Sequence, residues 1–253
     1  MTLTFAEPLG PTPTINIALI GPPKTGKTAG AGSAPGPVGY LNLDTPNATR
    51  FARKKYGDEH FREIKIPEVT EEQQSPVLDT LYDLGRAAFA AELATIVIDP
   101  ISDLYRRLLE EKTQRKLRFG IEHRGDVSTI MARTFLGLCE APVNFVAVAH
   151  EMPVKDEGSG ETRVYPFTGT NNTNLGGKLL GNVDIIAYSG VSYAEDGTPT
   201  YLAQLTSAKG RPGGDRFDCL ADPATGCREL NLAEWVQAIR DAETPTQNHK
   251  ENK

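Results

Sequence analysis

Residues 21–28 read Gly-Pro-Pro-Lys-Thr-Gly-Lys-Thr and directly follow an apolar run at residues 15–20. The stretch fits the pattern Gly-x-x-x-x-Gly-Lys-Ser/Thr without a mismatch. From average residue usage, a chance match in a chain of this length is expected on the order of one time in a hundred. With a strand before it and small residues after it, the stretch predicts a phosphate-binding loop between a strand and a helix.

The residue types in this loop are those that bind nucleotide phosphates. Gly26 lets the backbone turn so that successive N–H groups face phosphate oxygens at a helix N-terminus. Lys27 reaches the β and γ phosphates, and the Thr28 hydroxyl ligates Mg²⁺. The prolines have no N–H, so we expect the cradle to begin at Lys24. The predicted nucleotide-binding residues are Gly21, Pro22, Pro23, Lys24, Thr25, Gly26, Lys27 and Thr28.

Continuous apolar runs indicate a mostly parallel sheet with both faces covered. They occupy residues 15–20, 38–43, 95–98 and 143–149. Residues 184–189 and 201–207 flank a turn at residues 194–197, which predicts an antiparallel hairpin. The predicted fold class is α/β, with a mostly parallel central sheet flanked by helices and a C-terminal antiparallel hairpin. We expect one domain over residues 15–241 between flexible tails at 1–14 and 242–253.

Start signals place the helices between these strands. Ser75 before Pro76 predicts a helix whose apolar stripe is Val77, Leu78, Leu81, Leu84 and Ala88. Ser102 predicts an N-cap for a helix to about Leu117, and Asp126 predicts another N-cap. Asn231 with Glu234 resembles a capping box for the last helix. After the phosphate loop, glycines and Pro35 limit the first helix to two turns at most.

Composition limits where in the cell the protein is expected to work. The chain has 253 residues, is 39% hydrophobic and 24% charged, and carries a net charge of -6. Its apolar runs fall far short of the roughly 20 residues that span a bilayer, and no secretory signal begins the chain. Three cysteines suggest neither a disulfide framework nor a metal site. We expect a cytoplasmic protein without membrane contact.

An aspartate follows the apolar run at residues 95–98. Asp99 ends this predicted strand, as in the Walker B pattern, where the carboxylate holds the outer shell of Mg²⁺. Many P-loop ATPases place a catalytic glutamate immediately afterwards, but this chain has Pro100. An AAA+ or helicase-type protein is therefore disfavoured. The chain also lacks the Asp-x-x-Gly and Asn/Thr-Lys-x-Asp motifs of GTPases, so guanine specificity is unsupported.

The sequence resembles a RecA-type ATPase core, and more narrowly the phage RecA-like ATPases associated with single-strand annealing recombination. The resemblance covers residues 15–217 and implies ATP and Mg²⁺ as cofactors. It rests on the phosphate loop and on segments at residues 40–44, 96–99, 146–151 and 207–211, which read Tyr-Leu-Asn-Leu-Asp, Ile-Val-Ile-Asp, Val-Ala-Val-Ala-His-Glu and Ser-Ala-Lys-Gly-Arg. Only the phosphate loop is specific to such ATPases by itself. The other segments support the resemblance through their order and spacing.

The resemblance implies roles for further residues. His150 matches the polar residue that senses the γ phosphate, although a histidine there could also merely cap a strand. The family's water-orienting glutamate corresponds to Pro46. Either Asp44 or Glu151 replaces it, or hydrolysis is slow and the protein acts chiefly as an ATP-dependent switch. The catalytic candidates are Lys27, Asp99, His150, Glu151 and Asp44.

Segments outside the phosphate site point to DNA and to neighbouring subunits. Residues 152–174 lack periodicity and occupy the place of the family's DNA-binding loop, where Lys155, Arg163 and Tyr165 would contact phosphates and stack on bases. A plain solvated loop is the alternative. Lys209 and Arg211 correspond to residues that act in trans on a neighbour's nucleotide, or they are surface charges. A basic cluster at residues 112–124 is interpreted as a solvated face.

The expected function is an ATP-binding, ATP-hydrolysing protein that acts on single-stranded DNA in recombination or annealing and assembles as a homo-oligomeric ring or filament. Two alternatives stay open. A P-loop kinase of a small metabolite would use an acceptor pocket and an arginine-rich lid. A nucleotide-gated assembly protein would have no DNA role.

Overall fold

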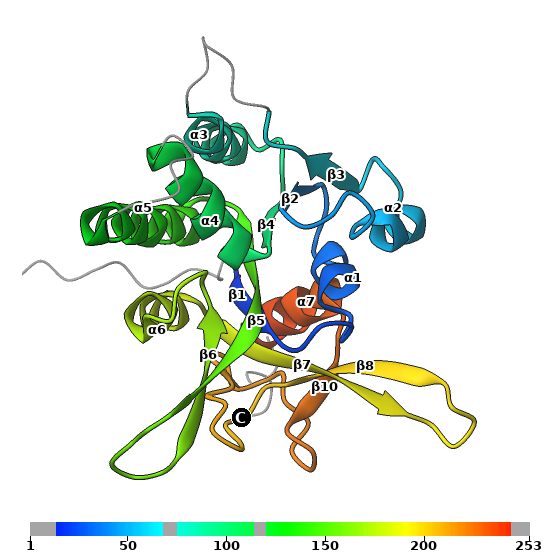
Figure 1. Cartoon of the computed structure of the whole chain (residues 1–253). Helices are drawn as coiled ribbons and strands as arrows, with labels where there is room; N and C mark the ends of the chain where they lie inside the picture. The colour runs from blue at the N-terminus through cyan, green and yellow to red at the C-terminus, as the bar shows by residue number, and fades with distance from the viewer. Residues whose placement is uncertain (1–13, 68–74, 114–119, 244–253) are drawn as a thin grey trace, which may run out of the picture.

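A central ten-stranded sheet runs through the molecule (Figure 1). The computed structural model describes residues 14–67, 75–113 and 120–243. The strands are β1 (Asn16–Ile20), β2 (Val38–Asn42), β3 (Phe61–Ile64), β4 (Thr95–Asp99), β5 (Asn144–Lys155), β6 (Thr162–Phe167), β7 (Ile185–Tyr193), β8 (Pro199–Gln204), β9 (Gly214–Asp215) and β10 (Cys227–Glu229). The helices are α1 (Lys27–Gly32), α2 (Arg50–Tyr56), α3 (Pro76–Phe89), α4 (Ile101–Lys112), α5 (Ile121–Glu140), α6 (Thr173–Asn182) and α7 (Leu232–Glu243).

Six neighbouring strands of the sheet are parallel, in the order β3-β2-β4-β5-β1-β7. The antiparallel strands β8 and β10 extend the β7 edge, β9 also pairs with β7, and β6 pairs with β5. The predicted α/β class, with a mostly parallel sheet and a C-terminal antiparallel hairpin, is confirmed. Strand β5 lies between β1 and β4, so the middle of β5, near Ala149, is beside both the phosphate loop and Asp99.

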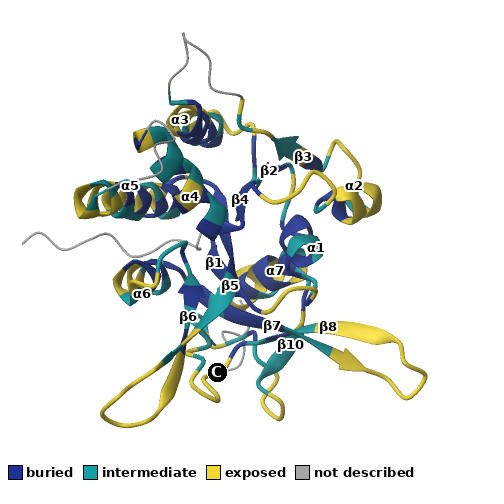
Figure 2. Cartoon of the chain, viewed as in Figure 1, coloured by how far each residue is buried: buried dark blue, intermediate teal, exposed yellow. Residues whose placement is uncertain are grey.

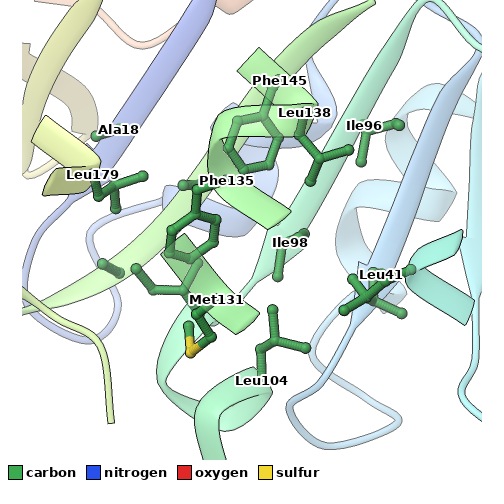
Figure 3. Packing of buried hydrophobic residues seen from close by; sticks show 14 of the residues in the cluster. Ala18, Leu41, Ile96, Ile98, Leu104, Met131, Phe135, Leu138, Phe145 and Leu179 are labelled. Carbon is green, nitrogen blue, oxygen red and sulfur yellow. The ribbon is translucent and has the colours of Figure 1, made fainter. Parts of the chain in front are cut away.

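Helices cover both faces of the sheet, which explains why its strands are continuously apolar. Ile96 and Ile98 of β4 face a cluster shared with α3, α4, α5 and α6. Val97, between them, faces a second cluster shared with α1, α2 and α7. Figure 3 shows part of the first cluster, where the rings of Phe135 and Phe145 have centroids 6.2 Å apart. Full burial of each such side chain contributes about 1.5–3 kcal/mol.

Two helices begin earlier than their start signals predicted. Helix α4 begins at Ile101 after the N-cap Pro100, so Ser102 lies buried in its first turn and is not the cap. Helix α5 begins at Ile121 after Gly120, which places Asp126 inside the helix. Glycine is an acceptable N-cap, and the Gly120 N–H is satisfied by Nδ1 of His123 at 3.3 Å. Polar residues inside the first turns of a helix can therefore be mistaken for the N-cap in the sequence.

Helices α3 and α7 begin where predicted, with differences in detail. Leu78 is 38% exposed and does not belong to the buried stripe of α3. At α7, Nδ2 of Asn231 donates to Oε1 of Glu234 at 2.7 Å, so the two side chains contact each other. The backbone N–H of Trp235 donates to the Asn231 carbonyl at 3.1 Å, which starts the helix.

The segment predicted as a loop at residues 152–174 is instead mostly ordered secondary structure. Strand β5 continues to Lys155 and forms an antiparallel hairpin with β6, and α6 follows from Thr173. The turn is closed by Asp156, whose Oδ1 accepts hydrogen bonds from the N–H groups of Gly158 and Ser159 at 2.9 and 2.7 Å. The tips of this hairpin and of the β7–β8 hairpin are exposed (Figure 2).

Some predictions fall on undescribed residues. The tail at residues 1–13, the C-terminal segment from residue 244 onward, the helix end at Leu117 and the cluster members Arg115, Lys116 and Arg118 lie outside the described residues. In the described part of that cluster, Lys112 pairs with Asp126 at 3.2 Å. No described helix is long and apolar enough to span a bilayer.

Candidate nucleotide-binding site

The phosphate loop connects β1 to α1, as predicted. Gly26 has a φ of 81°, the left-handed conformation that glycine adopts without strain, and directly precedes the first helical residue. A side chain there would also collide with Tyr201 of β8, because its Cβ would lie 2.6 Å from a ring carbon. Two constraints therefore require glycine at this position.

Helix α1 has six residues, within the predicted limit of two turns. Its glycines make close packing possible: a Cβ on Gly30 would lie 2.5 Å from Cγ of Leu230. The residues that weaken the helix therefore bring the C-terminal segment against it, and tertiary packing fixes the helix that carries Lys27 and Thr28.

Lys27 is 7% exposed, and its ammonium group turns back over the loop. Its Nζ donates to the carbonyl oxygens of Gly21 at 2.9 Å and Pro22 at 2.6 Å. Burial lowers the pKa of Lys27, and the negative charges of Asp99 and Glu151 oppose that shift. The loop therefore holds a buried positive charge where a phosphate group would bring stronger acceptors.

Asp99 lies next to the loop at the end of β4 and is 7% exposed. Its Oδ2 accepts the Thr28 hydroxyl at 2.7 Å and also the hydroxyl of Tyr40. Burial raises the pKa of Asp99, while the hydrogen bonds from Tyr40 and Thr28 and the charge of Lys27 lower it. The threonine and the carboxylate predicted to serve magnesium are therefore in direct contact.

These residues suit a magnesium ion that arrives with a nucleotide. Magnesium keeps several waters and is bound by one or two protein groups together with substrate phosphates. The Thr28 hydroxyl can ligate the ion through an oxygen lone pair while its O–H keeps donating to Asp99. Within the described residues, no three His, Cys, Asp or Glu side chains gather as a metal site, so phosphate oxygens and waters would complete the shell. Bound magnesium would neutralise charge on the phosphates.

Glu151, two residues beyond the last buried position of β5, forms an ion pair with Arg211. Arg211 donates from Nε and Nη2 to the two carboxylate oxygens at 2.8 and 3.0 Å. Beside it, Nδ1 of His150 is buried and has no hydrogen-bond partner among the described residues. The structure therefore brings His150, Glu151 and Asp99 to the same end of the sheet as Lys27.

Asp44 is exposed, in the loop after β2. The N–H of its neighbour Leu43 donates to the Asp99 carbonyl at 2.8 Å, which keeps this loop at the end of β4. Oδ1 of Asp44 accepts a hydrogen bond from the N–H of Thr45 at 2.7 Å. Asp44 therefore lies at the rim of the site, while Glu151 is the acid whose charge acts on Lys27.

Comparison with known families supports this geometry. The sequence model of the AAA domain family matches residues 14–217. The chain belongs to the AAA domain family. Pro100 disfavoured an AAA+ or helicase-type protein. The family match shows an AAA-type P-loop domain over the whole core, so Pro100 excludes one position for a catalytic acid and not the AAA-type domain. As an AAA domain with a phosphate loop, the chain has a P-loop nucleotide-binding fold.

Other comparisons with this AAA domain add little detail. No curated protein matches the chain. Among solved structures, a KaiC-like protein from the hyperthermophilic archaeon Pyrococcus horikoshii is similar, with a TM-score of 0.45 and 14% identity over 77% of this chain and 79% of that chain.

The predicted DNA contacts of the AAA domain lie on the β5–β6 hairpin but not on one face. Met152 pairs with Tyr165 and Val154 with Arg163, so Arg163 and Tyr165 share a face. Lys155 pairs with Thr162 on the opposite face. The Lys155 face includes Val164, which is 6% exposed and packs in the main core. Arg163 and Tyr165 therefore lie on the face turned away from that core.

The two predicted trans-acting residues of the AAA domain differ in surroundings. Both belong to a tight turn in which Ala208 and Arg211 bridge. Lys209 is exposed, with a φ of 51°. Arg211 is bound to Glu151 of its own chain. The third basic residue of this region, Arg216, pairs with Asp184 at 3.1 Å.

Three contacts in the AAA domain's site escaped the sequence analysis. Tyr40 reaches Asp99, Ser189 of β7 shares a hydrogen bond of 2.6 Å with Thr25, and Tyr201 covers Gly26. Tyr40 carried a usable signal, because a tyrosine inside an otherwise apolar buried strand needs a partner for its hydroxyl. Ser189 and Tyr201 come from distant strands, and no local pattern marks them.

Proposed function

We propose that this chain is a RecA-like ATPase that binds and hydrolyses ATP with Mg²⁺ and binds single-stranded DNA in recombination or annealing. One observation carries the proposal: β5 is a single strand whose middle lies beside the phosphate loop and whose end forms an exposed hairpin. The two predicted sites are therefore on one continuous element.

At the nucleotide end, β5 supplies the two candidates that would sense and hydrolyse ATP. His150 has a buried Nδ1 that a phosphate oxygen or a water could engage. The charges of Asp99 and Glu151 both act on Lys27. We propose that Glu151 orients the attacking water, because this chain has Pro46 in place of the family's glutamate. Its ion pair with Arg211 holds the carboxylate in place.

At the hairpin end, residues suited to single-stranded DNA share one face. Arg163, Tyr165 and Phe167 occupy every second position of β6. Arg163 is exposed, and the two aromatic residues are partly exposed. Aromatic rings that stack on bases beside a basic side chain are the usual design for sequence-tolerant binding. Phe167 pairs with His150 across the two strands, so the stacking face begins at the candidate phosphate sensor. A cleft of about 520 Å³, lined by residues 161–163 and 207–212, adjoins this region.

We further propose a homo-oligomeric ring or filament in which Lys209 of one subunit approaches the nucleotide of the next. Lys209 is exposed on its turn. Arg211 is engaged within its own chain, so Lys209 is the better candidate for action in trans. A cation at the γ phosphate would stabilise charge that develops during transfer.

Turnover and DNA binding can be tested together. We expect ATP hydrolysis to rise on addition of single-stranded oligonucleotide, and labelled oligonucleotide to bind more tightly with ATP than without. Lys27→Ala is the matched control and should lose both responses. Phosphate transfer to a small metabolite would instead indicate a kinase, and nucleotide binding with neither turnover nor DNA binding would indicate a nucleotide-gated assembly protein.

Electron microscopy tests the assembly. With ATP and oligonucleotide, rings or filaments are expected. Isolated monomers at high protein concentration would contradict the oligomeric part of the proposal.

A further inference from the structure

We propose that Tyr40 is a positioning residue for the magnesium site, because its phenol fixes the Asp99 carboxylate in the orientation that serves Thr28 and the metal. The inference rests on the proposed ATP binding and adds a residue to the same site. Its hydroxyl and that of Thr28 both donate to the same oxygen, Oδ2 of Asp99.

The strand register brings Tyr40 to this place. Strands β2 and β4 are parallel neighbours, and Asn42 pairs with Asp99 while Tyr40 pairs with Val97. Tyr40 is thus two residues behind the level of Asp99 and reaches forward with its ring. Tyr40 of β2 and Thr28 of α1 therefore hold the same carboxylate oxygen from two different elements.

The phenol has little freedom to turn away. Tyr40 is fully buried, and its ring stacks on Phe61 of β3 with centroids 4.6 Å apart and an interplanar angle of 29°. Its own position is therefore set by core packing and not by Asp99. A rigid donor of this kind pre-orients the carboxylate before any metal arrives.

The second hydrogen bond also matters because Asp99 is buried. A buried carboxylate needs hydrogen bonds to compensate for lost water. Without Tyr40, Oδ2 would keep the Thr28 hydroxyl and Lys27 would remain as the nearby cation. The carboxylate would then be free to rotate toward Lys27, which would draw it away from Thr28 and from the metal position.

The test is Tyr40→Phe, which removes one oxygen and keeps the stacked ring. We expect the Mg²⁺ concentration for half-maximal nucleotide binding to rise at least about 10-fold, as for other outer contacts of metal sites. Affinity for nucleotide in EDTA should stay unchanged, because Lys27 and the loop backbone are intact. Mn²⁺ binding in the presence of ADP, followed by electron paramagnetic resonance, should weaken in parallel and requires no turnover.

A matched control is Tyr56→Phe. Tyr56 also donates its hydroxyl near α1, to the Ala29 carbonyl at 3.1 Å, but it does not touch Asp99. This variant should keep the parent's metal response. Tyr40→Met, which removes the hydroxyl together with the stacked ring, should show at least the shift seen in Tyr40→Phe.

The outcomes separate the two ideas. Equal metal responses in Tyr40→Phe and the parent would overturn the positioning role, as would an equal loss of affinity with and without metal. If the parent itself binds no nucleotide, the proposed function fails and not the role of Tyr40 alone.

Discussion

Arg211 and Glu151 form a two-point ion pair between the turn at residues 208–211 and the strand β5, with N···O distances of 2.8 and 3.0 Å. The pair joins a residue expected to act on a neighbouring subunit to a residue expected to orient water. Both side chains are mostly buried, with 28% and 16% exposure. Neither group can take on its expected task without affecting the other.

The first prediction follows from this pairing. Glu151→Gln should lower ATP turnover by about 10²-fold or more, because it removes the carboxylate proposed to orient the attacking water. Arg211→Ala should also change turnover, and the double variant should differ from the sum of the two effects by about 0.5–3 kcal/mol. A double-mutant cycle on kcat measures this, and strict additivity would show that the ion pair does not tune hydrolysis.

The second prediction concerns Lys27. Lys27→Ala should abolish or greatly weaken ATP binding, since the ammonium group is the buried cation of the loop. The thermal unfolding midpoint should change little, because the side chain bonds to loop carbonyls and does not pack in either hydrophobic cluster. Calorimetric titration with ATP gives the answer, and undiminished affinity would contradict the assignment of the loop.

The third prediction separates the two faces of the hairpin. Arg163→Ala and Tyr165→Ala should each weaken binding to single-stranded DNA, by lost phosphate contact and lost stacking. Lys155→Ala, on the opposite face, should have the smaller effect. Affinity should fall with salt, and Arg163→Ala should reduce the salt slope by about 1. A larger effect at Lys155 would place the DNA on the other face.

The fourth prediction tests action in trans at Lys209. Mixing Lys27→Ala protein with Lys209→Ala protein should restore part of the ATPase activity, because one subunit supplies an intact nucleotide pocket and the other an intact lysine. Turnover per parent subunit should also rise with protein concentration. Constant turnover together with no rescue would assign Lys209 to its own subunit or to the surface.

The fifth prediction uses Cys139, on the inner side of α5. Burial raises the pKa of its thiol to about 12, with Asp184 adding to the shift. The reactive thiolate is therefore scarce at pH 8, and iodoacetamide should modify Cys139 far more slowly in the native chain than after unfolding. A moderate rise in pH above 8 should increase its rate, because a larger fraction of the thiol is then ionised. Peptide mass spectrometry after timed labelling measures both, and rapid native labelling at pH 8 would contradict the burial.

Local patterns were sufficient for the phosphate loop, the four central strands and the β7–β8 hairpin, because each has a distinctive composition or turn. They failed for the β5–β6 hairpin. Pro153 and Pro166 interrupt its alternation of residue types, and both occupy strand positions. This two-stranded extension of the sheet tolerates them, but a sequence pattern does not reveal which strands have an open edge.

The contacts within the site depended on register and packing. That Tyr40 meets Asp99 follows from the pairing of β2 with β4, and that Arg211 meets Glu151 follows from the fold of a distant turn. Residue type indicated that the Tyr40 hydroxyl needs a partner, but neither residue type nor distance along the chain predicts which residue that partner is. The glycines of α1 were read as weak helix formers, whereas Leu230 and Phe61 press against them.

The unbroken course of β5 has a mechanical consequence. At about 3.3 Å per residue, the five steps from His150 to Lys155 span about 17 Å. Beyond the sheet, the strand stays paired with β6 from His150 to Lys155, so we expect the hairpin to move as one unit about a pivot near His150. A rotation of about 10° at the pivot would carry the tip through about 3 Å over that span. A small displacement near the phosphates would thus become a larger displacement at the hairpin tip.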